Sequence, residues 1–163
     1  MIREVTGNIL TADVEALVNP VNTVGVMGAG LAKQVKLAYP GVFREYVEAC
    51  RSGLLAPGCV MAHRVNNPTG SSCLRYIISF PTKQDWRNPS RLVRDGLVSL
   101  RDTLKWIPID NPALAPIRSI ALPCLGCGLG GLDWAEVREL IHAKLGDLHE
   151  IEILLYTGTP PAV

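Results

Sequence analysis

Short apolar runs alternate with amphipathic segments along most of the chain. Runs rich in β-branched and aromatic residues predict buried strands, and LRYIISF at residues 74–80 is the strongest of them. Apolar residues at helical spacing predict helices in the segments between the strands. We expect strands at residues 2–5, 14–18, 59–64, 74–80, 117–122 and 151–156, and helices at residues 31–39, 42–51, 90–106 and 134–145.

This alternation of strands with helices predicts the fold class, a three-layer α/β/α sandwich with a mixed central sheet. In sheets of this kind the ligand crevice lies at the C-terminal ends of the strands. Two glycine-rich loops and the loop at residues 81–87 all begin at such ends. We therefore expect these three loops to converge on one site.

Two of the predicted helices carry recognisable start signals. Ser90 is expected to cap the long helix, which would turn four leucines inward: Leu92, Leu97, Leu100 and Leu104. Asp133 is expected to cap the last helix, with Glu136 at the capping-box position.

The composition is that of an ordinary folded domain. The 163 residues are 48% hydrophobic and 19% charged, which predicts a single domain over residues 1–163. The formal net charge of +1 offers no general attraction for a polyanion, so a nucleic-acid partner would have to meet a local patch. No apolar run approaches the length of a membrane span and the N-terminus does not resemble a signal peptide, so we expect no membrane partner and a cytoplasmic location.

The five cysteines do not have the spacing of a secreted disulfide framework, which favours a reducing compartment. Cys124 and Cys127 form a C-x-x-C pair, which can be redox-active or supply half of a zinc site. The sequence has no second pair to complete tetrahedral zinc, and its three histidines lack ligand spacing. We expect the two cysteines to act as small apolar side chains in a tight loop.

The stretch NPVNTVGVMGAGLAKQ at residues 19–34 holds the first candidate site. It leads from a predicted strand through a glycine-rich turn into a predicted helix, an order in which backbone N–H groups and a helix N-terminus can bind phosphate. The stretch contains two asparagines, Asn19 and Asn22, whose amides can donate and accept hydrogen bonds. It also contains three glycines, which permit positive φ: Gly25, Gly28 and Gly30. The alternative is a turn that needs glycine and is capped by the asparagines. The convergence of the three loops favours the ligand-binding interpretation.

The second glycine-rich loop, GCGLGG at residues 126–131, formally matches G-x-G-x-x-G between a strand and a helix. This pattern is typical of dinucleotide-binding oxidoreductases, but only about thirty residues follow it, too few for the second half of a Rossmann fold. Neither glycine loop has the lysine of a P-loop. We expect the second loop to offer N–H groups to a second phosphate, so that the two loops together suit a diphosphate.

The third loop belongs to the segment FPTKQDWR at residues 80–87. Lys83 follows a buried strand, where partial enclosure would lower its pKa and suit it as a nucleophile or an acid–base group. The alternative is a solvated surface lysine, which general frequencies favour. Trp86 and Arg87 would either stack on and pair with a nucleic-acid strand or cover the next helix.

Five motifs, in order, resemble those of the macrodomain family: GNI at 7–9, VNPVN at 18–22, VMGAGLA at 26–32, FPTK at 80–83 and GCGLGGLDW at 126–134. The resemblance covers nearly the whole chain. Within the family it points to the ADP-ribosyl-glycohydrolase branch, which includes DarG, the antitoxin of DarT–DarG systems, and the human terminal ADP-ribose protein glycohydrolase. FPTK with the following WR is the most specific motif and indicates the DarG type.

The resemblance implies a binding site for ADP-ribose. Its adenosine end would lie near Asn8 and Tyr156, although many macrodomains have aspartate where this chain has Asn8, and asparagine cannot supply the same charge-assisted hydrogen bond. The implied ligand-binding residues are Asn8, Ile9, Pro20, Val21, Asn22, Gly28, Gly30, Leu31, Ala32, Thr82, Gly126, Cys127, Gly128, Leu129, Gly130, Gly131 and Tyr156. Residues 28–32 would meet the proximal phosphate and the distal ribose, and residues 126–131 the diphosphate.

The resemblance also implies the chemistry. Lys83 would be the catalytic lysine near the anomeric carbon, Asn22 would lie beside the distal ribose, and Trp86 and Arg87 would contact DNA. The human enzyme has an aspartate aligned with Gly130 that assists the release of acyl-linked ADP-ribose. Its absence disfavours glutamate-linked protein substrates and favours a base-linked one.

The predicted function is therefore the removal of ADP-ribose from thymidine in single-stranded DNA, without a metal or cofactor. Two alternatives stay open: a reader module that binds ADP-ribose without hydrolysing it, and a hydrolase of protein-linked ADP-ribose. The implied partners are ADP-ribose, ADP-ribosylated single-stranded DNA and a DarT-like toxin. Contact with the toxin is expected to need a further C-terminal region. This domain would then be either a macrodomain excised from a longer antitoxin or a stand-alone macrodomain.

Overall fold

The structure, a computed structural model, describes residues 1–65, 73–83, 89–110, 115–127 and 131–158. Within these residues six strands form one sheet in the order β1-β6-β5-β2-β4-β3. The strands are β1 (Ile2–Val5), β2 (Ala16–Asn22), β3 (Met61–Arg64), β4 (Tyr76–Lys83), β5 (Ser119–Pro123) and β6 (Glu152–Tyr156). All neighbours run parallel except β3, which is antiparallel to β4. The predicted mixed sheet is confirmed.

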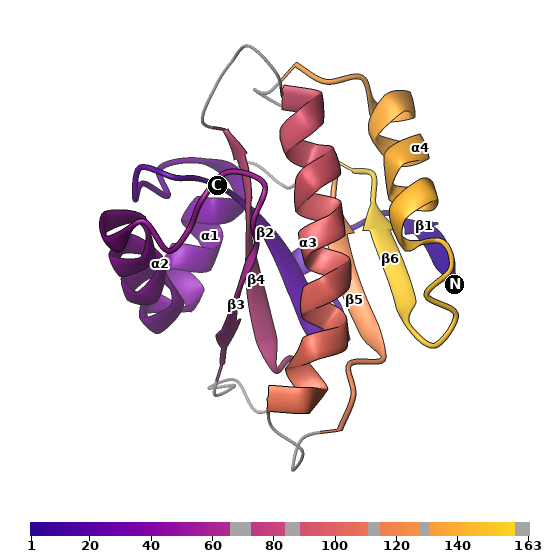
Figure 1. Cartoon of the computed structure of the whole chain (residues 1–163), viewed down its shortest axis with the longest axis horizontal. Helices are drawn as coiled ribbons and strands as arrows, with labels where there is room; N and C mark the ends of the chain where they lie inside the picture. The colour runs from indigo at the N-terminus through magenta and orange to yellow at the C-terminus, as the bar shows by residue number, and fades with distance from the viewer. Residues whose placement is uncertain (66–72, 84–88, 111–114, 128–130, 159–163) are drawn as a thin grey trace.

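Helices cover both faces of the sheet. They are η1 (Ile9–Thr11), α1 (Gly30–Ala38), α2 (Pro40–Ser52), α3 (Pro89–Asp110) and α4 (Trp134–Leu145). In Figure 1, α3 and α4 lie in front of the sheet, whereas α1 and α2 lie behind it and to one side. The predicted three-layer α/β/α architecture is therefore confirmed. Each described helix is too short or too polar to serve as a membrane span.

The alternation of side chains along the strands sends neighbouring residues into different core clusters on the two faces of the sheet. In β2, Ala16 and Val18 pack into the cluster shared with α3 and α4, whereas Leu17 packs into the cluster shared with α1 and α2. This is the period of two that a pleated strand imposes, and a central strand that is buried on both faces needs apolar residues at every position. Each fully buried aliphatic side chain contributes about 2 kcal/mol of transfer free energy.

Helix α3 approaches the sheet closely at Gly96. A Cβ atom built on Gly96 would lie 2.4 Å from the ring of Phe80, which is fully buried in β4. Phe80 therefore occupies the space that any other residue at position 96 would need. This contact fixes the height of α3 above β4, the strand that ends in Lys83.

The two central strands extend further than the sequence pattern indicates. We expected strands at 14–18 and 74–80, but β2 runs to Asn22 and β4 to Lys83. The pairing continues because both chains stay extended through Pro20 and Pro81, which lack an N–H but still fit an extended backbone. A register shift between Val21 and Asn22 ends the ladder.

Two expected caps differ from the structure. Helix α3 begins at Pro89, so Ser90 lies inside the helix instead of capping it. Leu97, Leu100 and Leu104 are buried as expected, but Val93 takes the buried position that we expected for Leu92. Asp133 does occupy the N-cap position of α4, but its side chain makes no capping hydrogen bond.

Candidate functional site

Two pockets meet at Pro20, at the C-terminal ends of the parallel strands. The first, which we name the β6 pocket, has a volume of about 310 Å³ and is lined by Gly7, Ile9, Pro20, Leu31, Pro123, Cys124, Cys127, Tyr156, Thr157 and Gly158. The second, the β4 pocket, has a volume of about 260 Å³ and is lined by Pro20, Val21, Asn22, Val26, Gly28, Ala29, Ala32, Thr82 and Lys83. We refer to both together as the cleft. It lies at the sheet edge where the sequence predicted a site.

The N-terminus of α1 forms part of the cleft wall. The N-cap residue is Ala29, which has no side-chain oxygen to cap the helix, and the first turn carries no acidic residue. The first hydrogen bond of the helix runs from the Lys33 N–H to the Ala29 carbonyl at 3.2 Å. The N–H groups of the first turn therefore have no intrahelical acceptor, and the positive end of the helix dipole faces this region. The arrangement suits an anion.

Two of the three glycines in the first loop need their special backbone freedom. Gly25 has φ +83° and Gly30 has φ +57°, both in the left-handed region. Gly28 has no positive φ, and an added Cβ would make only an ordinary contact at 3.5 Å. The prediction of positive φ is thus confirmed for Gly25 and Gly30 and wrong for Gly28, which lines the β4 pocket without this constraint.

Asn22 and Lys83 lie side by side at the ends of neighbouring strands. They are paired residues in the parallel register of β2 and β4, although 61 positions separate them in the sequence. Both line the β4 pocket, together with the buried Thr82. Lys83 is exposed, so the expected enclosure of its side chain was wrong. Lys83 therefore lines the pocket with a solvent-exposed side chain at the last residue of β4.

The side-chain amide of Asn22 is held within the first loop. Its Nδ2 donates to the carbonyl of Val26 at 2.8 Å, and its Oδ1 accepts from the N–H of Val24 at 3.1 Å. The hydroxyl of Tyr46 donates to the same Oδ1 at 2.5 Å. Asn19, in contrast, is fully buried and lines neither pocket, and its amide has no hydrogen-bond partner among the described residues. Of the two asparagines, only Asn22 reaches the cleft.

The β6 pocket has a largely apolar wall. Ile9 and Leu31 are buried within it, and Tyr156 ends β6 beside it. Cys124 and Cys127 are free thiols, and the Cys124 Sγ–H donates to the Tyr156 carbonyl at 3.4 Å.

The two thiols stay protonated and uncharged near neutral pH, as expected for small apolar side chains. Burial raises the pKa of Cys124, and burial together with the neighbouring Cys124 and Asp133 raises the pKa of Cys127 to about 11. Reactive thiols have lowered pKa values, so these two do not match a redox pair. Among the described residues, no cluster of three or more His, Cys, Asp or Glu side chains could hold a metal ion.

Some residues predicted for the site do not line the cleft. Asn8 uses its Oδ1 to accept from the Leu10 N–H at 3.0 Å and so caps η1. Gly30 shapes the start of α1, but it does not line either cleft pocket. The two loop glycines Gly126 and Gly131, with φ +71° and +70°, are also absent from the described linings of these two pockets. The remaining predicted residues lie outside the described part of the chain: Trp86, Arg87, Gly128, Leu129 and Gly130.

Several cleft residues were not predicted. Gly7, Thr157 and Gly158 line the β6 pocket because β1 and β6 run parallel and end together. The signal was available, since these residues directly follow predicted strands. Val26 and Ala29 line the β4 pocket within a loop that was itself predicted.

The charge of the cleft is simple. None of the described residues that line it is acidic, and Lys83 is their only charged side chain. A negatively charged ligand would therefore meet main-chain N–H groups, the end of a helix dipole and one ammonium group.

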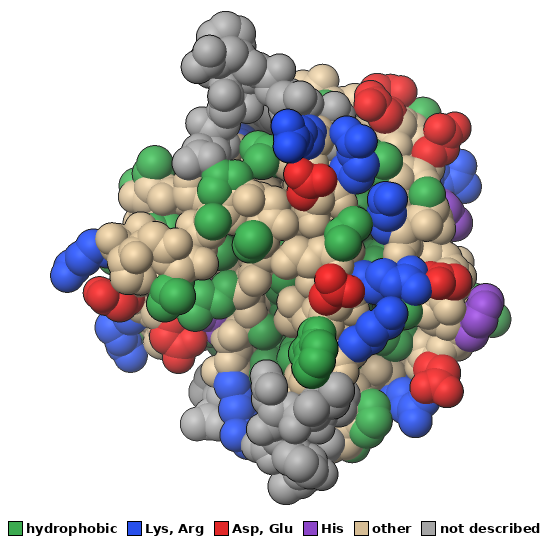
Figure 2. Space-filling view, viewed as in Figure 1, with side chains coloured by type: hydrophobic (Ala, Val, Ile, Leu, Met, Phe, Trp, Pro, Cys, Tyr) green, Lys and Arg blue, Asp and Glu red, His purple; other side chains and the backbone are tan. Residues whose placement is uncertain are grey.

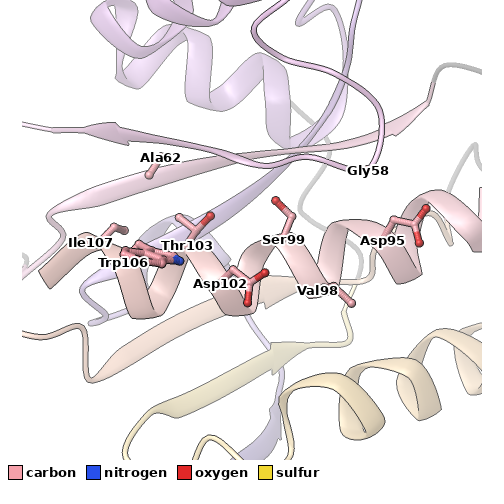
Figure 3. Close-up of a pocket in the computed structure, with 9 residues that line it drawn as sticks. All are labelled: Gly58, Ala62, Asp95, Val98, Ser99, Asp102, Thr103, Trp106 and Ile107. Atoms are coloured by element: carbon pink, nitrogen blue, oxygen red, sulfur yellow. The ribbon is translucent and has the colours of Figure 1, made fainter. Parts of the chain in front are cut away.

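A larger groove lies elsewhere, between β3 and α3. It has a volume of about 450 Å³ and is lined by Gly58, Ala62, Asp95, Val98, Ser99, Asp102, Thr103, Trp106 and Ile107. Figure 3 shows Ser99 and Thr103 projecting from α3 toward the strand that carries Ala62. No residue predicted for the functional site lines this groove.

The sequence model of the family described as Macro domain matches residues 18–141, which include all the described residues that line the β4 pocket. This chain belongs to the macrodomain family. The solved macrodomain of Thermus aquaticus DarG is 43% identical, with a TM-score of 0.79 over 97% of this chain and 99% of that one. The macrodomain of Mycobacterium tuberculosis DarG is 35% identical, with a TM-score of 0.84 over 98% and 99%. The chain is thus a macrodomain of the DarG type.

The curated relatives are longer proteins. The Thermus aquaticus relative, named DNA ADP-ribosyl glycohydrolase, is 44% identical over 96% of this chain and 41% of its own length. A Thermosipho africanus relative, named as a fusion of a DNA ADP-ribosyl transferase with a DNA ADP-ribosyl glycohydrolase, is 33% identical over 93% of this chain and 40% of its own length. A solved Thermosipho africanus DarTG structure in complex with ADP-ribose is 29% identical, with a TM-score of 0.78. The macrodomain chain spans about two fifths of the length of such relatives.

Proposed function

We propose that this macrodomain hydrolyses the bond between ADP-ribose and a thymidine base of single-stranded DNA. The observation that carries the proposal is the pairing of Asn22 with Lys83 in the β4 pocket, beside the uncapped N-terminus of α1. The names of the DarG relatives support the same reaction class. Anion-binding backbone and an ammonium group at one pocket suit the cleavage of a diphosphate-bearing sugar.

In this proposal ADP-ribose spans the cleft. The adenosine lies in the β6 pocket against Ile9 and Tyr156, and the diphosphate meets the first turn of α1. The distal ribose enters the β4 pocket between Asn22 and Lys83. Binding energy from the adenosine and diphosphate, which do not react, holds the anomeric carbon in place for the reaction.

The chemical step breaks the C–N bond between the anomeric carbon and the thymine. The transition state has oxocarbenium character, and the electron pair of the broken bond leaves with the base nitrogen, which gains a proton. A water molecule supplies the hydroxyl group that ends on the ribose. Lys83 provides acid–base catalysis or forms a transient covalent bond with the sugar, and its exposed position lets a polymer-linked substrate reach it.

Turnover of a thymidine-ADP-ribosylated single-stranded oligonucleotide tests the proposal. We expect Lys83→Ala to lower kcat by at least about 100-fold while ADP-ribose affinity changes less than about threefold, because the diphosphate and adenosine contacts remain. Lys105→Ala, which removes an exposed lysine from α3, is the matched control and should leave both quantities unchanged. Binding of ADP-ribose without turnover by the native chain would support a reader module instead.

A parallel assay with ADP-ribosylated protein separates the two hydrolase functions. Activity on the protein substrate alone would contradict the DNA proposal. Trp86 and Arg87 follow Lys83 closely in the chain, and we propose that they contact the DNA strand. Trp86→Ala should then raise KM for the oligonucleotide and leave free ADP-ribose binding unchanged.

We further propose a DarT-like toxin as the functional partner, because a relative carries both activities in one polypeptide. The chain covers less than half of the relatives' length, so we assign toxin contact to a region beyond this domain. A cytoplasmic location is consistent with five unpaired cysteines.

A further inference from the structure

Tyr46 is the largest polar side chain in the core behind the first loop. It lies in α2, is fully buried, and packs with Val21, Met27, Ala49 and Leu55. A buried phenol needs a partner for its hydroxyl group. The partners, Asn22 and Val26, lie in the first loop of the cleft, 24 and 20 positions earlier in the chain.

The Tyr46 hydroxyl lies at the turn that begins with Asn22. Its oxygen is 2.9 Å from the Asn22 main-chain carbonyl, 2.5 Å from the Asn22 Oδ1 and 3.4 Å from the Val26 carbonyl. Burial raises the pKa of Tyr46 above its ordinary value, which favours the protonated hydroxyl. The hydroxyl has one proton to donate, and the shortest of the three distances is the one to the Asn22 Oδ1.

This donor fixes which way the Asn22 amide faces. The Tyr46 hydroxyl and the N–H of Val24 both donate to one side of the amide, so that side must be the oxygen. The Val26 carbonyl accepts from the other side, which must be the nitrogen. An Asn amide nitrogen has two N–H groups, and the second is the one available to the β4 pocket that Asn22 lines.

We propose that Tyr46 is a positioning residue for the reaction: it locks the amide of Asn22 and the loop at residues 23–26, so that an Asn22 N–H faces the distal ribose next to Lys83. Tyr46 does not touch the substrate and acts only through Asn22. The inference rests on the proposed function for its catalytic consequence, but the locked loop is a property of the protein alone.

The kinetic test compares Tyr46→Phe with Tyr39→Phe. Tyr39 joins α1 to α2, is partly buried and lines neither cleft pocket, so its variant controls for the loss of a phenol hydroxyl. We expect Tyr46→Phe to lower kcat about tenfold with KM within twofold, because orientation is lost while diphosphate binding stays. Tyr39→Phe should change neither. A tenfold rise in KM for Tyr46→Phe, with kcat unchanged, would overturn the positioning role.

A double-mutant cycle shows whether Tyr46 acts through Asn22. In a chain that already carries Asn22→Ala, adding Tyr46→Phe should lower kcat by less than twofold, because the group that it positions is gone. Additive losses would mean that Tyr46 stabilises the cleft by another route and would refute the proposal.

Hydrogen exchange keeps the inference testable without catalysis. Tyr46→Phe should speed amide exchange at least about fivefold in residues 23–26, and Tyr39→Phe should leave that segment unchanged. If the native chain proves inactive on every substrate, the proposed function fails, but exchange still decides whether Tyr46 locks the loop. Unchanged exchange in Tyr46→Phe overturns the inference, whatever the activity.

Discussion

The cleft and the β3–α3 groove differ in what they offer a ligand. The groove, at about 450 Å³, is larger than either pocket of the cleft. Its lining includes two carboxylates, Asp95 and Asp102, and the indole of Trp106, which is 59% exposed. The cleft lining has no carboxylate among the described residues and one lysine. Charge therefore selects the cleft for a diphosphate.

The difference has a structural origin. The cleft lies where parallel strands end and a helix begins, so main-chain N–H groups without internal partners face the ligand. The groove runs along the flank of α3, where the helix uses its own N–H groups, so only side chains can recognise a ligand. Figure 2 shows acidic and basic side chains interspersed over α3 and α4, with no single-sign field on this face. For an anionic ligand, main-chain geometry therefore favours the cleft over the groove.

The largest expected effect comes from placing a carboxylate in the cleft. Ala29→Asp should weaken ADP-ribose binding roughly 100-fold, because a carboxylate about 4 Å from a phosphate repels it by several kcal/mol. The same carboxylate would cap α1 and raise the stability of the domain by about 1 kcal/mol. Calorimetry of ADP-ribose binding and urea unfolding would measure both effects.

Ser99→Asp is the matched change in the groove. It adds the same charge to the larger cavity and should alter ADP-ribose affinity by less than twofold. Weaker binding in Ser99→Asp than in Ala29→Asp would reverse the assignment of the two cavities.

The second expected effect concerns the shape of the second loop. Gly126 has φ +71°, and an added Cβ would lie 2.8 Å from the Leu132 Cδ1. Gly126→Ala should therefore lower the free energy of unfolding by about 1–3 kcal/mol and weaken ADP-ribose binding severalfold. Stability and affinity should fall together. A variant that loses stability but binds normally would show that this loop is not part of the cleft's function.

The third expected effect is a pH dependence of domain stability that ADP-ribose binding does not share. His63 is buried in β3 between Glu45, with its Nδ1 3.0 Å from the carboxylate, and the Ser79 hydroxyl, 2.8 Å from its Nε2. Burial lowers the pKa of His63, and Glu45 opposes that shift only in part. Just below pH 6.5 the His63 of the unfolded chain therefore binds more protons than the His63 of the folded chain. The contribution of this site to the free energy of unfolding is highest above that pH and falls as the pH drops toward the lowered pKa of the folded state.

Urea midpoints between pH 8 and 5 would measure this slope. His63→Gln should flatten it, whatever its effect on absolute stability, and His149→Gln, at an exposed position, should not. ADP-ribose affinity should follow the same pH course in both variants, because His63 lines neither pocket of the cleft. A change in affinity confined to His63→Gln would contradict this separation.

The smallest expected effect belongs to the groove itself. Trp106→Ala removes the exposed indole from the groove lining. ADP-ribose affinity and oligonucleotide turnover should stay within twofold of the native values. A loss greater than fivefold in either would show that the groove shares in substrate binding.

Much of the site was visible in the sequence. The motifs at 18–22, 26–32 and 80–83 all reach the β4 pocket, and Ile9, Cys127 and Tyr156 reach the β6 pocket. The prediction was wrong where it relied on a side chain's surroundings. Lys83 is exposed instead of enclosed, since it is the last residue of β4, and the seven strand residues before it are the buried ones.

The residue pattern was enough to predict the order of strands and helices, the left-handed backbone at Gly25 and Gly30, and the family. These properties depend on residues close to one another in the chain, through side-chain periodicity and backbone sterics. The contacts between distant groups, in contrast, became visible only in the folded chain. The strand register sets Asn22 beside Lys83, and the packing of α2 brings the Tyr46 hydroxyl to the Asn22 amide. Both contacts join segments that are distant in the sequence. The local residue pattern does not specify the strand register or the helix packing that brings these segments together.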